Sequence, residues 1–430
     1  MLLSFKTSNF KSFLDEVELK MTPAPKIKGM DYSIIKQTSN KKEIKALSTS
    51  IIYGSNASGK TNIVSAMDVF RNIILNGNIR NREKIATPDY AVWRLELIPN
   101  FNSLKQEPTT FDIEFNIEDV LVKYGISIDL GNFLAGEYHR KIIREILIID
   151  NKEIYERKEK EISFEEKNLK KYIPDNIDLN QVEALAINNL DDEELFLCNG
   201  FKNLYSKTLY DKITRWIGQN FIVTFRSNDL TITDLTNGKE ELTRYYNKIA
   251  KLIGTSTERI ELVDDEKGNQ IMLSVFAKLT ESNNLNAVPS EIVESLGTFR
   301  FLGLFPIFKR ALDIGATLVM DELDASINPM IIISLINIFH DEQINKNGAQ
   351  LIFNTHNPIF LNKNIVRRDE IKFVEKNDTT RVSELYALSD FGTSGEGSVR
   401  KNEDYLKNYY TNKYGAIKFI DLSEVFKSKE

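Results

Sequence analysis

The stretch STSIIYGSNASGKTNIVSAM, residues 48–67, decides the fold. An apolar run leads into a loop that matches the pattern GxxxxGK[ST] in full, and helix-like spacing of apolar residues follows. Glycines let backbone N–H groups surround a phosphate, and a helix N-terminus adds positive charge. The stretch therefore predicts a strand, a nucleotide-binding loop and a helix over about 60–75. The loop consists of Gly54, Ser55, Asn56, Ala57, Ser58, Gly59, Lys60 and Thr61.

Two carboxylates at the end of a second apolar strand extend this chemistry. In TLVMDE, residues 317–322, strand burial places Asp321 at the carboxyl edge of the sheet, where an open α/β fold binds its ligands. We expect Lys60 to contact the β- and γ-phosphates of ATP, and Thr61 and Asp321 to hold Mg²⁺. Glu322 is expected to orient or deprotonate the attacking water. Taken alone, TLVMDE is also typical of a strand that runs into a solvated acidic turn.

Two further motifs lie around the carboxylates. Ser295 and Gly297 in ESLGT, residues 294–298, precede an apolar helix, which predicts a second helix N-terminus that can contact an anion. An ordinary serine N-cap is the alternative. His356, in FNTHNP, lies 34 residues after Glu322, enough for one helix and one strand. This spacing returns His356 to the same sheet edge, although a structural histidine is the alternative.

Composition limits the class of protein. The 430 residues include 56 Lys and Arg and 62 Asp and Glu, a net charge of −6, and at about 150 residues per domain they predict two or three domains. A single cysteine, Cys198, excludes an internal disulfide and a Cys-rich zinc site. His139, His340 and His356 are too far apart in sequence to predict a metal cluster. We expect a cytoplasmic protein without a membrane partner, because no apolar run approaches the ~18 residues of a membrane span and the first residues lack signal-peptide features.

Periodicity predicts the organisation of the chain. Near-alternating residues predict two short strands around Asn9–Lys11, and residues 109–149 predict an antiparallel sheet. The strand, helix, strand order of residues 316–356 predicts a parallel sheet with helical crossovers. We divide the chain into the first half of a nucleotide-binding head (1–151), a mostly helical insertion rich in Lys, Glu, Asn and Leu (152–287), and the second half of the head (288–430).

In this order, the motifs resemble the ABC-type ATPase heads of SMC, RecF and OLD-like proteins. NFKSF, residues 9–13, resembles the opening of that group and implies a nucleotide contact for Lys11, while Asp324 and Ser326 resemble its D-loop. The segments ESLGTFR, DELDASINP and NYYTNKYGAIKFI are similar to the stand-alone RloA/AbiLi-type ATPases of bacterial anti-phage systems. The resemblance covers about residues 1–150 and 288–430. It implies an α/β fold, a mixed or parallel sheet with helices plus an antiparallel β subdomain.

The resemblance also implies a dimeric mechanism. In such heads ATP is held between the phosphate loop of one subunit and the signature helix of the other, so Ser295 and Gly297 would act in trans. The residues that would act in cis are Lys60, Thr61, Asp321, Glu322 and His356, of which Lys60, Glu322 and His356 would be catalytic. The signature is ESLGT rather than LSGGQ, with Leu296 in place of a usual glycine. Gln106 is the only candidate for a Q-loop, and a surface loop is favoured there. We therefore expect slow hydrolysis, or hydrolysis that waits for a partner.

Partners are implied by the same resemblance. OLD-family ATPases carry a Toprim nuclease that needs Asp-x-Asp, and no such pattern follows His356, so this chain is not expected to be a nuclease. The expected partners are a second copy or a higher homo-oligomer, and a separate effector such as a Toprim-type, RloB-like nuclease. Two alternatives stay open: a RecF- or SMC-like DNA-repair ATPase that binds DNA directly, and an ATP-held assembly scaffold.

Two groups of residues allow opposite interpretations. Basic clusters at residues 140–144, 158–160 and 167–171 are either solvated faces or a surface that contacts nucleic-acid phosphates. The tail aromatics either pack a terminal helix onto the core or form a docking surface for a partner. They are Tyr405, Tyr409, Tyr410 and Tyr414.

Overall fold

The computed structural model describes residues 1–25, 27, 29–80, 95–102, 107–131, 140–173, 179–224, 238–266, 270–276, 286–392, 399 and 403–426. Gln106 and His139 lie outside these residues, so the predictions made for them are not assessed. None of the helices in the described part of the chain is long and apolar enough to cross a membrane.

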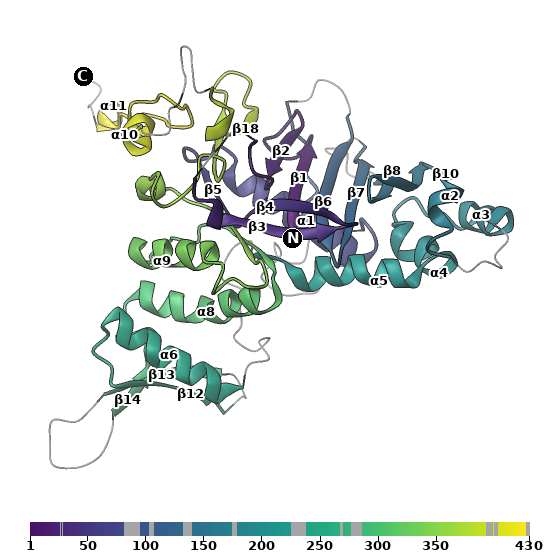
Figure 1. The fold of residues 1–430 in the computed structure, drawn as a ribbon. Helices are drawn as coiled ribbons and strands as arrows, with labels where there is room; N and C mark the ends of the chain where they lie inside the picture. The colour runs from purple at the N-terminus through teal and green to yellow at the C-terminus, as the bar shows by residue number, and fades with distance from the viewer. Residues whose placement is uncertain are drawn as a thin grey trace.

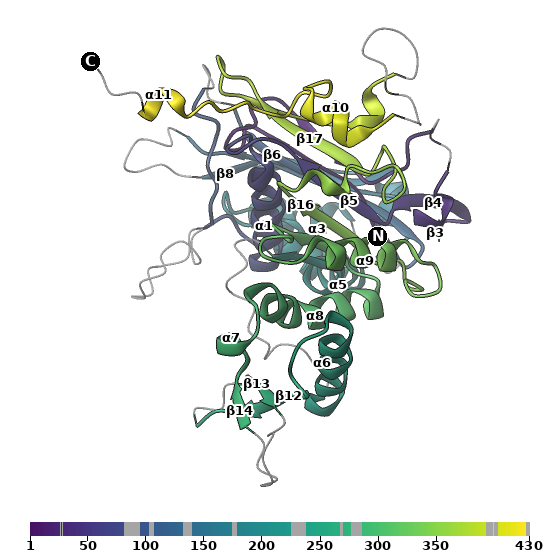
Figure 2. The ribbon, with the colours of Figure 1, turned by 90° about the vertical axis from the view of Figure 1, so that its left-hand side faces the viewer.

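A mixed sheet carries the predicted nucleotide loop. Its described strands follow the order β11-β15-β16-β5-β17-β18, in which all neighbours are parallel except β17 and β18. The predicted parallel sheet is therefore confirmed, with one antiparallel edge strand. β5 lies between β16 and β17, which follow it by about 300 residues in the chain (Figure 2). The strands are β5 (Thr49–Tyr53), β11 (Phe221–Thr224), β15 (Thr317–Met320), β16 (Gln350–Asn354), β17 (Ile371–Lys376) and β18 (Ser383–Ala387).

An antiparallel sheet lies beside it, as the alternating segments predict. The order of its described strands is β10-β9-β8-β7-β6-β1-β2. A separate hairpin of β3 (Ile34–Ser39) and β4 (Lys42–Leu47) precedes β5 and was not predicted. The strands of the sheet are β1 (Leu2–Ser8), β2 (Val17–Lys20), β6 (Thr109–Ile117), β7 (Val120–Asp129), β8 (Lys141–Ile149), β9 (Lys152–Lys158) and β10 (Glu161–Phe164).

Helices cover both faces of the mixed sheet. Because successive residues of a strand point to opposite faces, Ile51 and Ile52 lie in different cores. The face with Ile52 packs on α1 and the antiparallel sheet, and the face with Ile51 packs on α8, α9 and α10. The helices are α1 (Lys60–Asn76), α2 (Glu166–Leu169), α3 (Leu179–Asn188), α4 (Lys202–Leu204), α5 (Lys207–Arg215), α6 (Lys239–Ile253), α7 (Ser290–Val293), α8 (Leu296–Ile314), α9 (Pro329–His340), α10 (Tyr405–Tyr410) and α11 (Ser423–Phe426).

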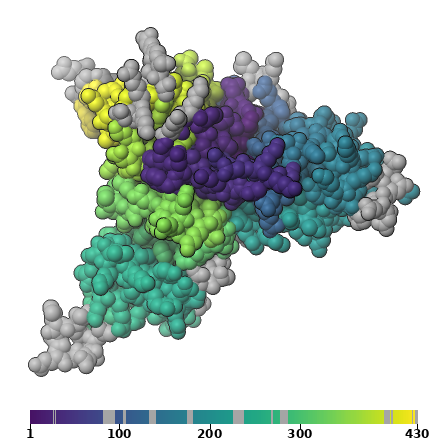
Figure 3. Space-filling view, in the orientation of Figure 1, coloured from purple at the N-terminus to yellow at the C-terminus, as the bar shows by residue number. Residues whose placement is uncertain are grey.

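The predicted helical insertion needs correction. Residues 152–164 form β9 and β10 of the antiparallel sheet, and β11 joins the mixed sheet beside β15. A three-stranded sheet of β12 (Arg259–Asp264), β13 (Gln270–Phe276) and β14 (Asn286–Pro289) packs on α6. The range 152–287 therefore contributes to several bodies: a helical lobe of α2–α5 against the antiparallel sheet, and a projection of α6 and β12–β14 below α8 (Figures 1 and 3).

Most of the tail aromatics pack onto the core, which was one of the two interpretations. Tyr405, Tyr409 and Tyr414 are buried in the core that contains α8, α9 and α10, and Tyr409 stacks on Phe373 of β17. Tyr410 differs, with 54% of its surface exposed.

Candidate functional site

The nucleotide-binding loop follows β5 and turns directly into α1. Gly59 has a φ of +110°, a conformation that side-chain-bearing residues rarely adopt. A Cβ on Gly59 would lie 2.5 Å from Ser12 Oγ and 2.9 Å from Ser383 Oγ. Only glycine fits this position, because the segments that contain Ser12 and Ser383 pack closely on the start of α1.

Two segments distant in sequence hold the loop in place. Ser383 at the start of β18 donates its hydroxyl to the Ser58 carbonyl at 2.6 Å, and its N–H to the Ser12 carbonyl at 2.8 Å. Asn62 of α1 donates to Ser12 Oγ at 2.8 Å. Ser12 belongs to the NFKSF segment, which therefore packs over the loop. Neither Ser383 nor Asn62 belongs to a sequence motif, because each acts through a contact with a remote segment.

Lys60 is folded back onto its own loop. Its ammonium donates to the carbonyls of Gly54 at 2.7 Å and Ser55 at 3.0 Å, and the residue is only 5% exposed. Burial lowers the pKa of Lys60 to about 8, against the opposing effect of Glu322 and nearby aspartates. Ser58 Oγ is also buried and has no hydrogen-bond partner among the described residues. The loop thus contains a buried cation and a buried hydroxyl, both of which can donate hydrogen bonds to phosphate oxygens.

Thr61 and Asp321 meet at the carboxyl edge of the sheet. The Thr61 side chain hydrogen-bonds to Asp321, which follows β15 and is 9% exposed. Burial raises the pKa of the Asp321 carboxyl, and hydrogen bonds from Asn354 and Thr61 oppose this shift. A hydroxyl and a carboxylate are the oxygen ligands that Mg²⁺ prefers. The pair predicted to hold Mg²⁺ is therefore brought together by the fold, and its chemistry fits that ion.

Glu322 has an unusual backbone. Its φ is +47°, and its side chain lies on the surface. The Glu322 N–H donates to Asn354 Oδ1 at 2.6 Å, and the Glu322 carbonyl accepts from Arg300 Nη2 of α8 at 3.0 Å. The carboxylate is close enough to Lys60 and His356 to influence the pKa of both. Glu322 thus faces the loop from a solvent-accessible position, where a water molecule can reach it.

His356 lies at the edge that its spacing predicts. Its Nδ1 is 3.5 Å from Lys60 Nζ. Partial desolvation and the positive charge of Lys60 lower the pKa of the imidazole below its usual value, so His356 is neutral at pH 7. A neutral imidazole can accept a hydrogen bond through one nitrogen and donate through the other.

The ESLGT residues and the D-loop residues form a second group. Ser295 caps α8 by accepting from the Thr298 N–H at 3.1 Å, and a Cβ on Gly297 would collide with the Ser326 carbonyl. Ser295, Gly297 and Ser326 line a largely apolar groove of about 940 Å³ between α6, α8 and α9. Asp324 points back toward β16, where its carboxylate accepts from the Thr355 hydroxyl at 2.7 Å. Gly297 thus packs against the backbone of Ser326 in the D-loop, while Ser295 bonds within its own helix end. The prediction that they act in trans stays a prediction.

Lys11 lies beside α1 rather than in the loop. Its ammonium contacts Ser65 Oγ at 2.5 Å and Glu96 Oε2 at 2.8 Å. Ser65 is one helical turn beyond Thr61, so Lys11 supports the helix that the loop begins. The nucleotide contact implied for Lys11 stays a prediction.

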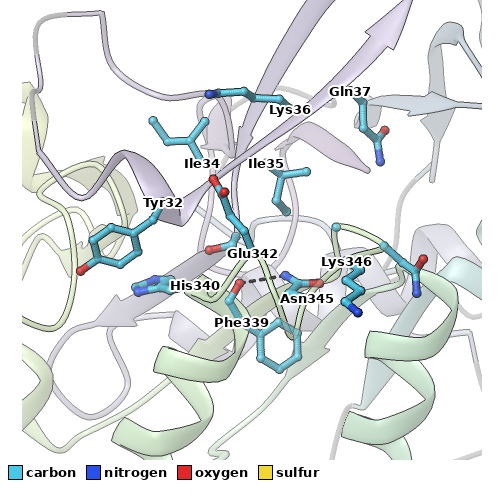
Figure 4. A pocket seen from close by; sticks show the side chains of 13 residues that line it. Tyr32, Ile34, Ile35, Lys36, Gln37, Phe339, His340, Glu342, Asn345 and Lys346 are labelled. Atoms are coloured by element: carbon cyan, nitrogen blue, oxygen red, sulfur yellow. Dashed lines mark hydrogen bonds between the residues drawn. The ribbon is translucent and has the colours of Figure 1, made fainter.

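A second hollow, of about 340 Å³, lies at the opposite edge of the mixed sheet between β3 and the α9–β16 connection (Figure 4). Here His340 Nε2 lies 3.0 Å from both Thr49 Oγ1 and Glu370 Oε1. Asn345 donates to the Phe339 carbonyl at 2.8 Å. These side chains join α9 to β5 and to the start of β16. The hollow is therefore lined by groups that hold the fold together, unlike the nucleotide loop.

Comparison with known proteins gives one family. The family model described as "AAA domain, putative AbiEii toxin, Type IV TA system" matches residues 50–362, more than half of the chain. The comparison with curated proteins gives no match. Among solved structures, the SMC head domain from Thermotoga maritima is similar, with 11% identity over 90% of this chain and 98% of that one and a TM-score of 0.36. A likeness at this TM-score supports no conclusion, and the α/β fold class rests on the strand order described above.

Proposed function

The chain belongs to the AAA-domain family whose model it matches, and from this premise we propose that it is a slow, Mg²⁺-dependent ATPase gated by dimerisation. In this proposal it is the sensor or regulatory subunit of an anti-phage defence system. The convergence of Lys60, Thr61, Asp321 and Glu322 at one sheet edge supports the proposal most strongly.

Each side chain has a defined task in hydrolysis. Lys60 exchanges its two carbonyl contacts for phosphate oxygens, which restores the stabilisation that its burial removes. Thr61 and Asp321 would hold Mg²⁺, which neutralises charge on the phosphates when bound. Glu322 orients the water that attacks the γ-phosphorus and accepts its proton. Neutral His356 hydrogen-bonds to the transferred phosphoryl group.

Dimer gating is supported by the surface around ESLGT. Leu296 is 69% exposed and Met330 is 66% exposed, and both lie beside the helix end that Ser295 caps. Large exposed apolar side chains are typical of surfaces that a protein partner covers. ATP bound between two such surfaces would stabilise the dimer by mass action, and hydrolysis would release it.

The effector is proposed to be a separate protein, such as a Toprim-type, RloB-like nuclease. Direct DNA binding, the repair alternative, has less support, because basic side chains in the clusters already have acidic neighbours. Lys158 lies 2.8 Å from Glu156, and Lys170 lies 3.9 Å from Glu166. These partners reduce the positive charge available to nucleic-acid phosphates.

The test uses the Glu322→Gln variant, which should bind ATP and hydrolyse it at only a small residual rate. With ATP and Mg²⁺, light scattering should show a stable dimer of Glu322→Gln and a transient one of wild type. Glu342→Gln, an exposed change at the opposite sheet edge, is the matched control and should behave as wild type. The proposal would be contradicted if wild-type protein had no ATP turnover, or if Glu322→Gln stayed monomeric in the presence of ATP and Mg²⁺. Tagged Glu322→Gln co-expressed with its neighbouring genes should then retain the effector.

A further inference from the structure

We propose that Asn354 is a positioning residue for hydrolysis, which holds the backbone of Glu322 in the conformation that aims its carboxylate at the nucleotide. This inference rests on the proposed ATPase function and adds a residue that the motifs do not identify. It follows from the contacts at the end of β16.

Asn354 lies between the strand that ends at Asp321 and the strand that leads into the nucleotide-binding loop. It is the last residue of β16, which pairs with β15 on one side and β5 on the other. The residue is 1% exposed. Its Nδ2 donates to Asp321 Oδ1 at 2.5 Å, and its Oδ1 accepts from the Glu322 N–H at 2.6 Å. A flipped amide would place two acceptors and two donors in contact, so the neighbours allow only this orientation.

The conformation of Glu322 explains why such a contact is needed. A φ of +47° is uncommon for a residue other than glycine and persists where the surroundings hold it. Asn354 holds the N–H of Glu322, and Arg300 holds its carbonyl. Because the Glu322 side chain is exposed, its direction depends on this fixed backbone more than on side-chain packing.

If Asn354 positions Glu322, the Asn354→Ala variant should lose ATP turnover without an equal loss of ATP binding. Asn354→Ala keeps the Lys60 contacts and the Thr61–Asp321 hydrogen bond but removes the donor to Asp321 Oδ1, so ATP affinity measured without Mg²⁺ should change by less than about threefold. Catalytic groups that lose their alignment cost large rate factors, and we expect kcat to fall about 10- to 100-fold. A purely structural role would change stability and leave kcat per folded molecule unaltered.

The matched control is Asn345→Ala. Asn345 is also a buried asparagine, 7% exposed, and its amide bonds to the carbonyls of Phe339 and Ala349 and the N–H of Ala349 at the opposite sheet edge. This change should lower the melting temperature and leave kcat of the folded fraction within twofold.

The decisive experiment is a double-mutant cycle read by single-turnover hydrolysis at saturating ATP. If Asn354 acts through Glu322, adding Asn354→Ala to Glu322→Gln should lower the residual rate by less than twofold, whereas the same change in wild type lowers it at least tenfold. An equal factor in both backgrounds would overturn the positioning role. Should Asn354→Ala fail to fold, Arg300→Ala takes its place, because Arg300 holds the carbonyl of Glu322. Its rate loss should be smaller than that of Asn354→Ala, and it should disappear when Glu322→Gln is also present.

The cycle separates this inference from the proposed function. Wild-type protein that does not hydrolyse ATP would remove the function itself. Wild-type turnover with additive mutant effects would remove only the role of Asn354.

Discussion

The two edges of the mixed sheet contain the same kinds of residues and use them in opposite ways. At the amino edge, Gln350 makes four hydrogen bonds: its Oε1 accepts from Leu2 and Thr317, and its Nε2 donates to the carbonyls of Leu2 and Leu47. At the carboxyl edge, Ser58 Oγ is buried and has no hydrogen-bond partner in the part of the chain that the structure describes, and the Lys60 cation bonds to the backbone of its own loop.

The two histidines differ in exposure. His340 at the amino edge is 2% exposed; its Nε2 contacts Thr49 and Glu370, and its buried Nδ1 has no hydrogen-bond partner among the described residues. His356 at the carboxyl edge is exposed, and among the described residues its side chain makes one long contact, 3.5 Å from Nδ1 to Lys60 Nζ. The edges therefore differ in where their polar groups lie: those of the amino edge join buried segments of the chain, whereas the Glu322 and His356 side chains at the carboxyl edge are open to solvent and to a ligand. Substitutions at the two edges should therefore separate activity from stability.

The largest effect is expected at the carboxyl edge. Lys60→Met removes the phosphate-binding cation, so kcat/KM for ATP should fall about a thousandfold, equivalent to ~4 kcal/mol. The free energy of unfolding should not fall, because the buried ammonium is destabilised by desolvation. ATP turnover and chemical denaturation of the same samples test both points. A large stability loss would show that Lys60 is a structural residue after all.

The next effect is expected at the amino edge. Gln350→Leu removes the buried hydrogen bonds that the Gln350 amide makes to the N–H and C=O of Leu2 and the C=O of Leu47, which should cost about 3–4 kcal/mol of unfolding free energy. Turnover per folded molecule should stay within twofold of wild type. Gln343→Leu, an exposed change in the α9–β16 connection, is the control. If Gln350→Leu reduced turnover in proportion to its stability effect, the two edges would not be separable.

A pH experiment tests the amino edge separately, because Lys372 at this edge has a pKa that burial lowers, as burial lowers the pKa of Lys60 at the carboxyl edge. Lys372 of β17 is 4% exposed, and desolvation lowers its pKa to about 8 from an ordinary 10.5. The unfolded chain therefore binds more protons between pH 8 and 10.5, so wild-type stability should rise with pH across that window, and the penalty is complete below pH 8. Lys372→Met should add about 2–3 kcal/mol at pH 7 and lose the rise. Parallel denaturation curves for the two proteins from pH 7 to 10 would contradict this reading.

Local patterns predicted the centre of the site. The GxxxxGK[ST] loop is continuous in sequence, and apolar strands that end in polar residues mark the edge where Asp321, Glu322 and His356 meet. The order of these elements also predicted the parallel sheet. Each of these features is determined by neighbours in the chain or by the geometry of a single crossover.

The parts that were missed depend on contacts between remote segments. Ser383 reaches Ser58 across 325 residues, and Arg300 reaches Glu322 through helix packing, so neither leaves a periodic signal. Asn354 lies within the quoted FNTHNP motif, but an asparagine there carries no sign of its partner. β9, sequence KEIYERK, lies in the range that its richness in Lys, Glu, Asn and Leu predicts to be mostly helical. Its place in the sheet depends on remote contacts, because Arg157 is fully buried and bonds to the carbonyls of Asp191 and Glu194.

The position of β5 in the sheet has a consequence for biosynthesis. The strand that leads into the phosphate loop is buried at all five residues, yet its neighbours β16 and β17 begin at residues 350 and 371. At about 5–20 residues per second, the ribosome needs roughly 15–60 s after β5 to complete the first of these partners. During that time the apolar strand has no native place, so the nascent chain should depend on chaperones, and its yield should fall when translation is slowed between the two halves.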